Sequence, residues 1–217
     1  VIFGVDVARF GDDETVIYRN YKGKLKLVAT RRGQNLMATV GDIVALYKKV
    51  IKEFPEYTGR VYVNIDDTGL GGGVTDRLIE VKREQKLHRL AVIPINAAEK
   101  IDTDTKEGKE AAEYFNNLTT HMWAVLRDLL ENKQIEIEDD ADTFAQLSIR
   151  KYFMASNGKL ELESKKEMKK RGVSSPDRAD AVALSTYLGK VKKHTGSGPG
   201  KEALDGLKKS SYWQNKK

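Results

Sequence analysis

Apolar and polar residues alternate along the first part of the chain in the manner of β-strands. Residues 1–8 form one apolar run, and residues 15–21 and 24–30 form two more, the last with Leu25 and Leu27 alternating against lysines. The connections between these runs are short, and short connections join antiparallel neighbours. The pattern therefore predicts three consecutive antiparallel strands.

Beyond these strands the apolar spacing changes between helical and strand-like periods. Helices are predicted over 37–54, from the glycine loop 69–73 to about 85, over 109–132 as the longest helix, and over 142–149. Strands are predicted over 60–65, 90–95 and 135–137. Asn157-Gly158 predicts a type I′ turn within a hairpin over 152–162. A last helix, running to about 188, is predicted to have Ser175 as its cap and Pro176 as its first residue.

This order of elements indicates the fold class. Leading antiparallel strands followed by alternating helices and strands describe an α/β protein with a mixed central sheet and helices on both faces, the order found in the RNase H-like fold. With 217 residues, 40% of them hydrophobic, the chain is long enough to bury a core. We expect one domain over 1–190 and a disordered tail, rich in Lys, Gly and Ser, over 191–217. Because residue 1 already begins a core strand, we expect the domain to be part of a longer polypeptide.

Composition narrows the function classes. The chain has no cysteine, so it forms neither disulfides nor thiolate metal sites. It has no apolar run near the roughly 18 residues that a membrane span needs, and no signal peptide opens it, so we expect a soluble intracellular protein. Lysines and arginines number 38 against 32 acids, for a net charge of +6. This surplus fits a polyanionic partner such as nucleic acid.

Two strands carry carboxylates at places where ligands bind. Asp6 interrupts the first strand on the face that it shares with Gly4 and Ala8, and these small neighbours leave room for a cation. A buried carboxylate needs a cation or hydrogen-bond donors to offset its lost hydration. Asp66 and Asp67 close the fourth strand, at the carboxyl end where sites in such sheets gather. Alternation favours Asp66 as the site residue but leaves the choice open.

The last helix carries two more acids in its first turns. Asp177 fits the preference of carboxylates for helix N-termini. Asp180 lies on the packing stripe with Ala183 and Leu184, so it should point toward the sheet. Acids from the first strand, the fourth strand and a late helix could converge on one point. Ligation by oxygens alone suits Mg²⁺ or Mn²⁺, and two such ions support phosphodiester cleavage.

Three blocks of sequence together resemble a known family. The blocks are "GVDVARFGDDETVI", "VNIDDTGLGGGVTDRL" and "SPDRADAVALS". With the spacing between them, they resemble the nuclease domain of the large terminase subunit of tailed bacteriophages, a member of the RNase H-like superfamily. The resemblance covers nearly all of 1–190. It implies a two-metal-ion endodeoxyribonuclease, using Mg²⁺ or Mn²⁺, that cuts concatemeric viral DNA during genome packaging.

The resemblance also implies residue roles and partners. Asp6, Asp66 and Asp180 take the catalytic and metal-ligand positions, Asp12 matches a further acid near the metals, and Asp177 assists. The implied partners are double-stranded DNA, the ATPase half of the same polypeptide, the small terminase subunit and the portal of the procapsid. The implied location is the cytoplasm of the infected bacterial host. The chain has no Walker A loop, so it should not itself translocate DNA.

A basic cluster precedes the last helix and consists of Lys165, Lys166, Lys169, Lys170 and Arg171. These residues would neutralise DNA phosphates beside the metal site, although an ordinary solvated helix face fits the pattern equally well. The hairpin over 152–162 resembles one that lies near the DNA-binding face in the terminase family.

Other functions remain as alternatives. An actin-like ATPase would need a duplicated domain, for which the chain is too short. A DNA-binding module without catalysis would not need converging carboxylates, which repel phosphate. Another RNase H-like nuclease, such as a junction resolvase or a transposase-type enzyme, is the nearest competitor. The glycine loop after Asp66 and the SPDRAD block favour the terminase over these.

Overall fold

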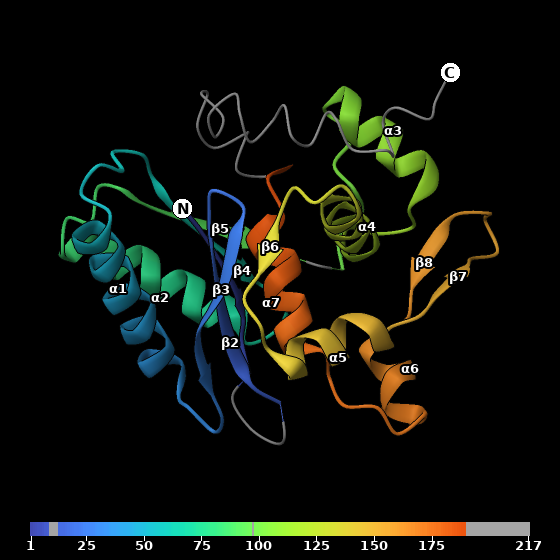
Figure 1. The fold of residues 1–217 in the computed structure, drawn as a ribbon, viewed down its shortest axis with the longest axis horizontal. Helices are drawn as coiled ribbons and strands as arrows, with labels where there is room; N and C mark the ends of the chain where they lie inside the picture. Colours follow the sequence, from blue (N-terminus) through green and yellow to red (C-terminus); the bar gives the residue numbers. More distant parts are fainter. Residues whose placement is uncertain (9–12, 97, 190–217) are drawn as a thin grey trace.

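The computed structural model describes residues 1–8, 13–96 and 98–189 (Figure 1). The predicted site residue Asp12 and the predicted tail, 191–217, lie outside the described residues. Within the described part, one sheet of six strands has the order β5–β4–β1–β2–β3–β6. Its strands are β1 (Ile2–Asp6), β2 (Thr15–Tyr21), β3 (Lys24–Arg31), β4 (Val61–Asp66), β5 (Leu90–Ile95) and β6 (Glu136–Ile137). A separate hairpin consists of β7 (Tyr152–Met154) and β8 (Leu160–Leu162).

The sheet is mixed, as the sequence predicts. β1 pairs antiparallel with β2, and β2 pairs antiparallel with β3. On the other side of β1, β4 and β5 run parallel to it. β6 adds a short parallel edge to β3. The three leading antiparallel strands and the mixed α/β class are therefore confirmed.

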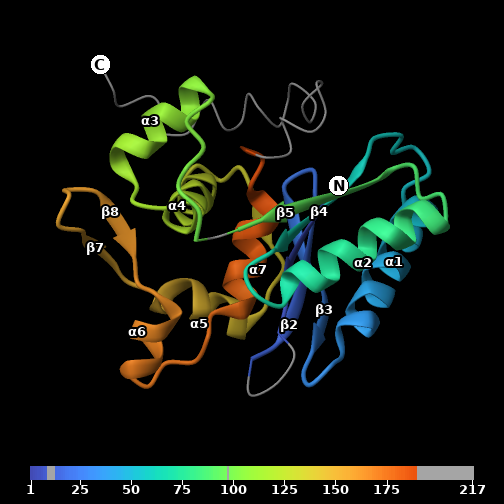
Figure 2. The ribbon, with the colours of Figure 1, turned by 180° about the vertical axis from the view of Figure 1, so that it is seen from behind.

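Helices cover both faces of this sheet. They are α1 (Leu36–Glu53), α2 (Gly71–Glu84), α3 (Lys106–Tyr114), α4 (Leu118–Glu131), α5 (Ala141–Ile149), α6 (Lys165–Lys170) and α7 (Asp177–Thr186). Figures 1 and 2 show α1 and α2 on one face, and α7 with α4 on the other. Because side chains alternate along a strand, Phe3 and Val5 of β1 join the core under α1 and α2, whereas Ile2 joins the core under α4 and α7. Among the described residues, no helix is both long and apolar enough to cross a membrane.

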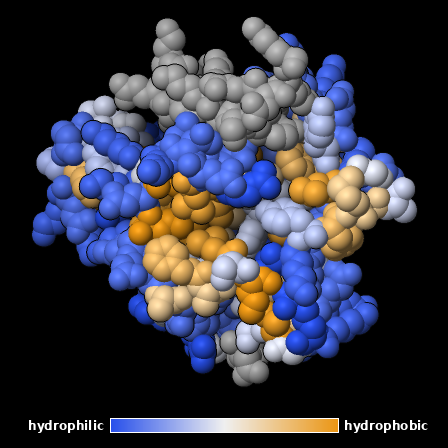
Figure 3. All heavy atoms as spheres, turned by 45° about the vertical axis from the view of Figure 1, so that its right-hand side comes forward, coloured by the Kyte–Doolittle hydropathy of each residue, from blue (hydrophilic) through white to orange (hydrophobic). Residues whose placement is uncertain are grey.

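α5, α6 and the β7–β8 hairpin project from the sheet on the side at the right of Figure 1. Figure 3, which brings this side forward, shows apolar areas within a mostly hydrophilic surface. The large apolar side chains that α5 and β7 expose are Phe144, Ile149, Phe153 and Met154. Little of the hairpin is buried, so it is an exposed arm attached to the domain.

The prediction of a single helix over 109–132 is wrong. The segment forms two helices, α3 and α4, with Phe115 extended between them at φ −114° and ψ 137°. Phe115 is buried and bridges to Leu160 of β8. Asn117 then caps α4 by accepting the amide hydrogen of Thr120. The packing of the hairpin against the segment, together with this cap, interrupts a continuous helical pattern.

Two local predictions about turns and caps are also wrong. In the hairpin only Gly158 has a positive φ, 76°, whereas a type I′ turn requires positive φ at Asn157 as well. The helix predicted to start at Pro176 starts one residue later, with Pro176 in the cap position and no side-chain cap. The hydroxyl of Ser175 donates instead to the carboxylate of Asp177.

α7 lies against β1 with its backbone in direct contact at Gly4. A Cβ atom added at Gly4 would lie 2.1 Å from the carbonyl oxygen of Ala181 and 2.3 Å from the amide nitrogen of Ser185. Any side chain at this position would therefore push the helix away from the sheet. Glycine at this position in β1 sets the distance between the two elements.

Two asparagines of the sheet hold the other end of α7. Nδ2 of the buried Asn64 donates to the carbonyl oxygens of Leu184 and Tyr187, both at 2.8 Å. Nδ2 of Asn20 donates to the carbonyl oxygen of Ser185 at 3.1 Å. These bonds satisfy carbonyl groups that the last turn of a helix leaves unpaired, and they fix α7 along the sheet.

We predict that Gly4→Ala will lower the free energy of unfolding by about 1–3 kcal/mol or more, because the added methyl group overlaps the α7 backbone. Gly41→Ala is the matched control, since Gly41 lies inside α1 and a Cβ there meets nothing within 4 Å. This control should gain about 0.5–1 kcal/mol. Chemical denaturation of the three proteins measures both values. A Gly4→Ala variant as stable as the parent would contradict the close contact.

Candidate active site

Two strands place carboxylates side by side at one end of the sheet. β1 and β4 are parallel with Val5 opposite Ile65, so the next residues, Asp6 and Asp66, leave the two strands on the same face. Asp6 is buried, with 5% of its surface exposed. Oδ1 of Asp66 accepts the amide hydrogen of Thr68 at 3.0 Å. This end of the sheet thus carries two neighbouring acids.

Asp67 does not join them. It follows the last residue of β4, and its Oδ1 lies near Gly72 at the start of α2. That oxygen is buried, with no hydrogen-bond partner among the described residues. Alternation along the strand therefore separates Asp67 from Asp66, and it is Asp66 that lies on the face of Asp6.

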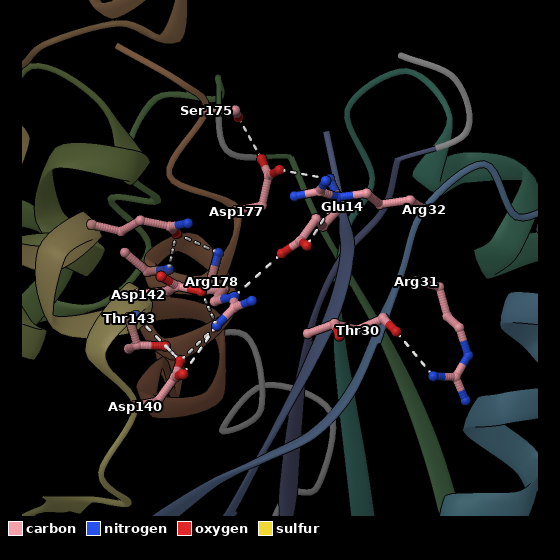
Figure 4. Close-up of polar contacts among 12 residues, drawn as sticks. Glu14, Thr30, Arg31, Arg32, Asp140, Asp142, Thr143, Ser175, Asp177 and Arg178 are labelled. Carbon is pink, nitrogen blue, oxygen red and sulfur yellow. Dashed lines mark hydrogen bonds and ion pairs between the residues drawn. The ribbon is translucent and has the colours of Figure 1, made fainter. Parts of the chain in front are cut away.

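α7 brings its two acids to the same place. Oδ1 of Asp180 accepts a hydrogen bond from Nε1 of Trp123 at 2.9 Å and from a guanidinium nitrogen of Arg150 at 2.7 Å. Asp177 is buried, and its Oδ2 accepts the amide hydrogen of Glu14 at 2.8 Å (Figure 4). Both carboxylates thus accept hydrogen bonds from residues outside α7.

The ammonium group of Lys165 lies where these acids converge. Its Nζ is 3.0 Å from Oδ2 of Asp6, 3.1 Å from Oδ2 of Asp180 and 3.5 Å from Oδ1 of Asp177. The Lys165 side chain remains 42% exposed, so the cluster opens to solvent on the side of α6. Carboxylates that are far apart in the sequence therefore share one cation.

The acids in this cluster differ in how easily they ionise. Burial raises the pKa of Asp6 to about 7; Lys165 opposes this shift, and the carboxylates of Asp180, Asp177 and Asp66 add to it. Burial also disfavours the charged form of Asp180, but Lys165, Arg150 and the Trp123 hydrogen bond outweigh it and lower the pKa of Asp180. Among the described residues, Asp180 accepts from more hydrogen-bond and charged donors than Asp6 does, which explains why the pKa of Asp180 is lowered and that of Asp6 is raised.

Lys165 itself is held strongly in its charged form. Burial works against the ammonium, but the carboxylates of Asp6, Asp180 and Asp177 raise the pKa of Lys165 well above its usual range. The lysine thus supplies a permanent positive charge to the cluster at neutral pH.

The carboxylate oxygens of the cluster are ligands that suit a hard divalent cation. In the part of the chain that the structure describes, no group of three or more His, Cys, Asp or Glu side chains is arranged to hold a metal ion directly. Three carboxylate oxygens do, however, lie within 3.5 Å of the Lys165 ammonium. Oxygen ligands of this kind suit Mg²⁺ or Mn²⁺, and the site accommodates a positive charge at this point.

The predicted basic cluster divides into two groups. Lys165 binds the acids, and Arg171 pairs with Glu163, its Nε lying 2.6 Å from Oε1. The other three residues, Lys166, Lys169 and Lys170, are exposed on α6. Of the five residues of the cluster, these three have side chains that face solvent and form no ion pair with the described residues.

The sequence pattern missed Arg150 and Trp123, both of which bind Asp180. Arg150 follows α5, in a segment whose sequence contains no catalytic motif. Trp123 lies on the apolar stripe of α4, where the sequence pattern predicts an ordinary core residue. Each is separated from Asp180 by many residues, so no local spacing links them. Only the packing of α4 and α5 against α7 brings them together.

A second ionic network fixes the start of α7. Arg178 pairs with Asp140 and Asp142, at the beginning of α5, and with Glu14, just before β2 (Figure 4). The same Glu14 donates its backbone amide hydrogen to Asp177. The network therefore ties the first turn of α7 to two other elements beside the acids.

Comparison with known proteins identifies the fold. No protein-family model and no curated protein matches the chain. The solved nuclease domain of the large terminase subunit gp2 of bacterial virus Sf6 is 18% identical, with a TM-score of 0.68 over 86% of this chain and 87% of that one. A lysine-to-alanine variant of that domain, solved with manganese, is 17% identical with a TM-score of 0.66 over the same shares.

A second phage provides a more distant match. The large terminase nuclease from thermophilic phage G20c, solved with bound magnesium, is 18% identical, with a TM-score of 0.50 over 85% of this chain and 78% of that one. These likenesses show that the chain has the fold of the terminase nuclease domains, which is the RNase H-like class predicted from the sequence.

We predict that Asp6→Asn will raise stability at neutral pH when metal is chelated. In the folded protein the pKa of Asp6 is about 7, above its ordinary value of 3.8. Between about pH 4 and about pH 7 the folded protein therefore binds more protons than the unfolded chain, so the folded protein loses stability as the pH rises through this range. Asparagine cannot ionise, so this loss disappears.

The measurement is thermal unfolding in EDTA at about pH 4 and about pH 8. Asp6→Asn should match the parent at the lower pH and exceed it at the higher. Asp76→Asn, at an exposed position of α2, is the control and should follow the parent at both. A variant that is less stable than the parent at the higher pH would make Asp6 an ordinary structural aspartate.

Proposed function

We propose that this chain is the nuclease domain of a tailed-phage large terminase subunit, a metal-dependent endodeoxyribonuclease that cuts concatemeric viral DNA during packaging. The observation that carries the proposal is the convergence of Asp6, Asp177 and Asp180 on one cation, with Asp66 beside them. The likeness in fold to nuclease domains of terminases supports it.

Asp6, Asp66 and Asp180 would hold Mg²⁺ or Mn²⁺, with Asp177 assisting. When bound, two such ions would provide an activated water and neutralise charge on the phosphate during cleavage. The two neighbours solved with manganese and magnesium support this choice of cofactor.

The residues of the chain prepare the site in several ways. The strand ends hold Asp6 and Asp66 side by side, and the donors on Oδ1 of Asp180 leave its Oδ2 facing the centre. A metal ion and the Lys165 ammonium repel each other and cannot share one point. The exposed side of Lys165 allows the ammonium to turn toward solvent, where it would meet the DNA backbone.

We propose that DNA approaches over α6. Lys166, Lys169 and Lys170 lie exposed next to Lys165, and their charges would neutralise phosphates beside the acids. The net charge of +6 favours the same partner. The proposed further partners are the ATPase half of a terminase polypeptide, the small subunit and the portal, and the proposed place of action is the cytoplasm of the infected bacterium.

We predict that the protein nicks supercoiled plasmid with Mn²⁺ or Mg²⁺ and that EDTA prevents it. Asp6→Asn, Asp66→Asn and Asp180→Asn should each abolish cleavage, because each removes a charged ligand. The matched control is Asp67→Asn, one residue from Asp66 on the other face of the strand, which should still cut. Undiminished nicking in EDTA would overturn the metal-dependent mechanism.

We predict that replacing both Lys166 and Lys169 with glutamine will weaken DNA binding and reduce the slope of log affinity against log salt by about one to two. The control is the pair Lys49 and Lys52, which has the same spacing on α1, on the opposite face of the sheet. Fluorescence anisotropy with a DNA duplex over a range of salt concentrations measures the slope. Equal slopes for both double variants and the parent would exclude α6 from the DNA interface.

A further inference from the structure

Arg150 is a buried arginine that meets three different elements. Only 5% of its side chain is exposed. A guanidinium nitrogen donates to Oδ1 of Asp180 at 2.7 Å, and Nε donates to the carbonyl oxygen of Glu163, directly after β8, at 2.8 Å. The guanidinium carbon lies 5.0 Å from the centroid of the Trp123 ring. One side chain thus connects α7, the base of the hairpin and α4.

The two oxygens of Asp180 have different surroundings as a result. Oδ1 accepts hydrogen bonds from both Arg150 and Trp123, whereas Oδ2 faces only the ammonium of Lys165 within the described parts of the chain. An oxygen with two N–H donors has little capacity left for another cation. The carboxylate is therefore oriented with one oxygen directed to the shared centre.

We propose that Arg150 is a positioning residue, which fixes Oδ1 of Asp180 so that Oδ2 is presented to the metal ion. The proposal rests on the proposed nuclease function. Arg150 does not reach the DNA itself, because its side chain is almost completely buried. It acts through Asp180, in the way that hydrogen-bond partners of metal ligands orient those ligands and tune their affinity.

The shape of the guanidinium matters as much as its charge. It donates in two directions at once while lying over the Trp123 ring, and a lysine ammonium cannot reproduce this planar fork. Arg150→Lys keeps the positive charge beside Asp180 but loses the geometry. This substitution therefore separates positioning from simple charge compensation.

The experiment compares the parent, Arg150→Lys and a control in two measurements. The first is the rise in melting temperature that Mn²⁺ gives to the DNA-free protein, and the second is the Mn²⁺ dependence of plasmid nicking. The control is Arg89→Lys, because Arg89 also donates to backbone carbonyls, of Gly59 and Tyr57, and lies over an aromatic ring, that of Tyr57. Arg89 directly precedes β5, outside the acid cluster.

We expect Arg150→Lys to need about 10- to 100-fold more Mn²⁺ in both measurements. Arg89→Lys should keep the Mn²⁺ dependence of the parent, even if its melting temperature falls. An Arg150→Lys protein with the Mn²⁺ dependence of the parent would overturn the positioning role and leave the nuclease function intact. A parent protein that neither cuts DNA nor gains stability with Mn²⁺ would overturn the proposed function itself.

Trp123→Phe provides an independent variant in case Arg150→Lys does not fold. It removes the second donor to Oδ1 of Asp180 and keeps a ring under the guanidinium. A Mn²⁺ requirement raised severalfold supports the orientation of Asp180 by these donors. An unchanged requirement in a folded Trp123→Phe protein, when Arg150→Lys is unfolded, overturns the proposal.

Discussion

The direct contact between Gly4 and the backbone of α7 determines how closely the helix lies against the sheet. The first turns of α7 carry Asp177 and Asp180, and β1 ends at Asp6. Asn64 and Asn20 hold the other end of the helix. Because Gly4 lets the helix lie directly against the sheet and the asparagines fix its position along it, the carboxylates lie together at the ends of β1 and β4. The geometry of the acid cluster follows from this packing.

Crowded carboxylates destabilise a fold unless positive charge or hydrogen-bond donors compensate them, and the domain supplies both from outside the sheet. Lys165 begins α6, Arg150 follows α5, and Trp123 comes from α4. All of them belong to the part of the chain between β5 and α7. The sheet and α7 thus contribute the acids, while the intervening segment contributes the side-chain donors that hold Asp6 and Asp180.

The donors also create an asymmetry between the acids. Asp180 is kept charged by three donor groups. Asp6, for which Lys165 is the one side-chain donor among the described residues, has a pKa raised by burial to about 7. The proposed divalent cation would relieve the repulsion among these carboxylates that the protein alone leaves partly uncompensated. Under that proposal, the stability of the folded domain and the affinity of the site for metal would be linked through the same carboxylates.

The sequence alone determined the order and type of most elements and placed Asp6 on the first strand, Asp66 at the end of the fourth and Asp180 on the last helix, because alternation along strands and helical spacing are local properties of the chain. It favoured Asp66 over Asp67 as the site residue without deciding between them. It could not show that Phe115 breaks a helical pattern, since the cause is a contact with Leu160. Nor could it show that the ammonium of Lys165 pairs with the acids, or that Arg150 and Trp123 bind Asp180. Those arrangements depend on pairs of residues far apart in the chain, and only tertiary packing decides which of them meet.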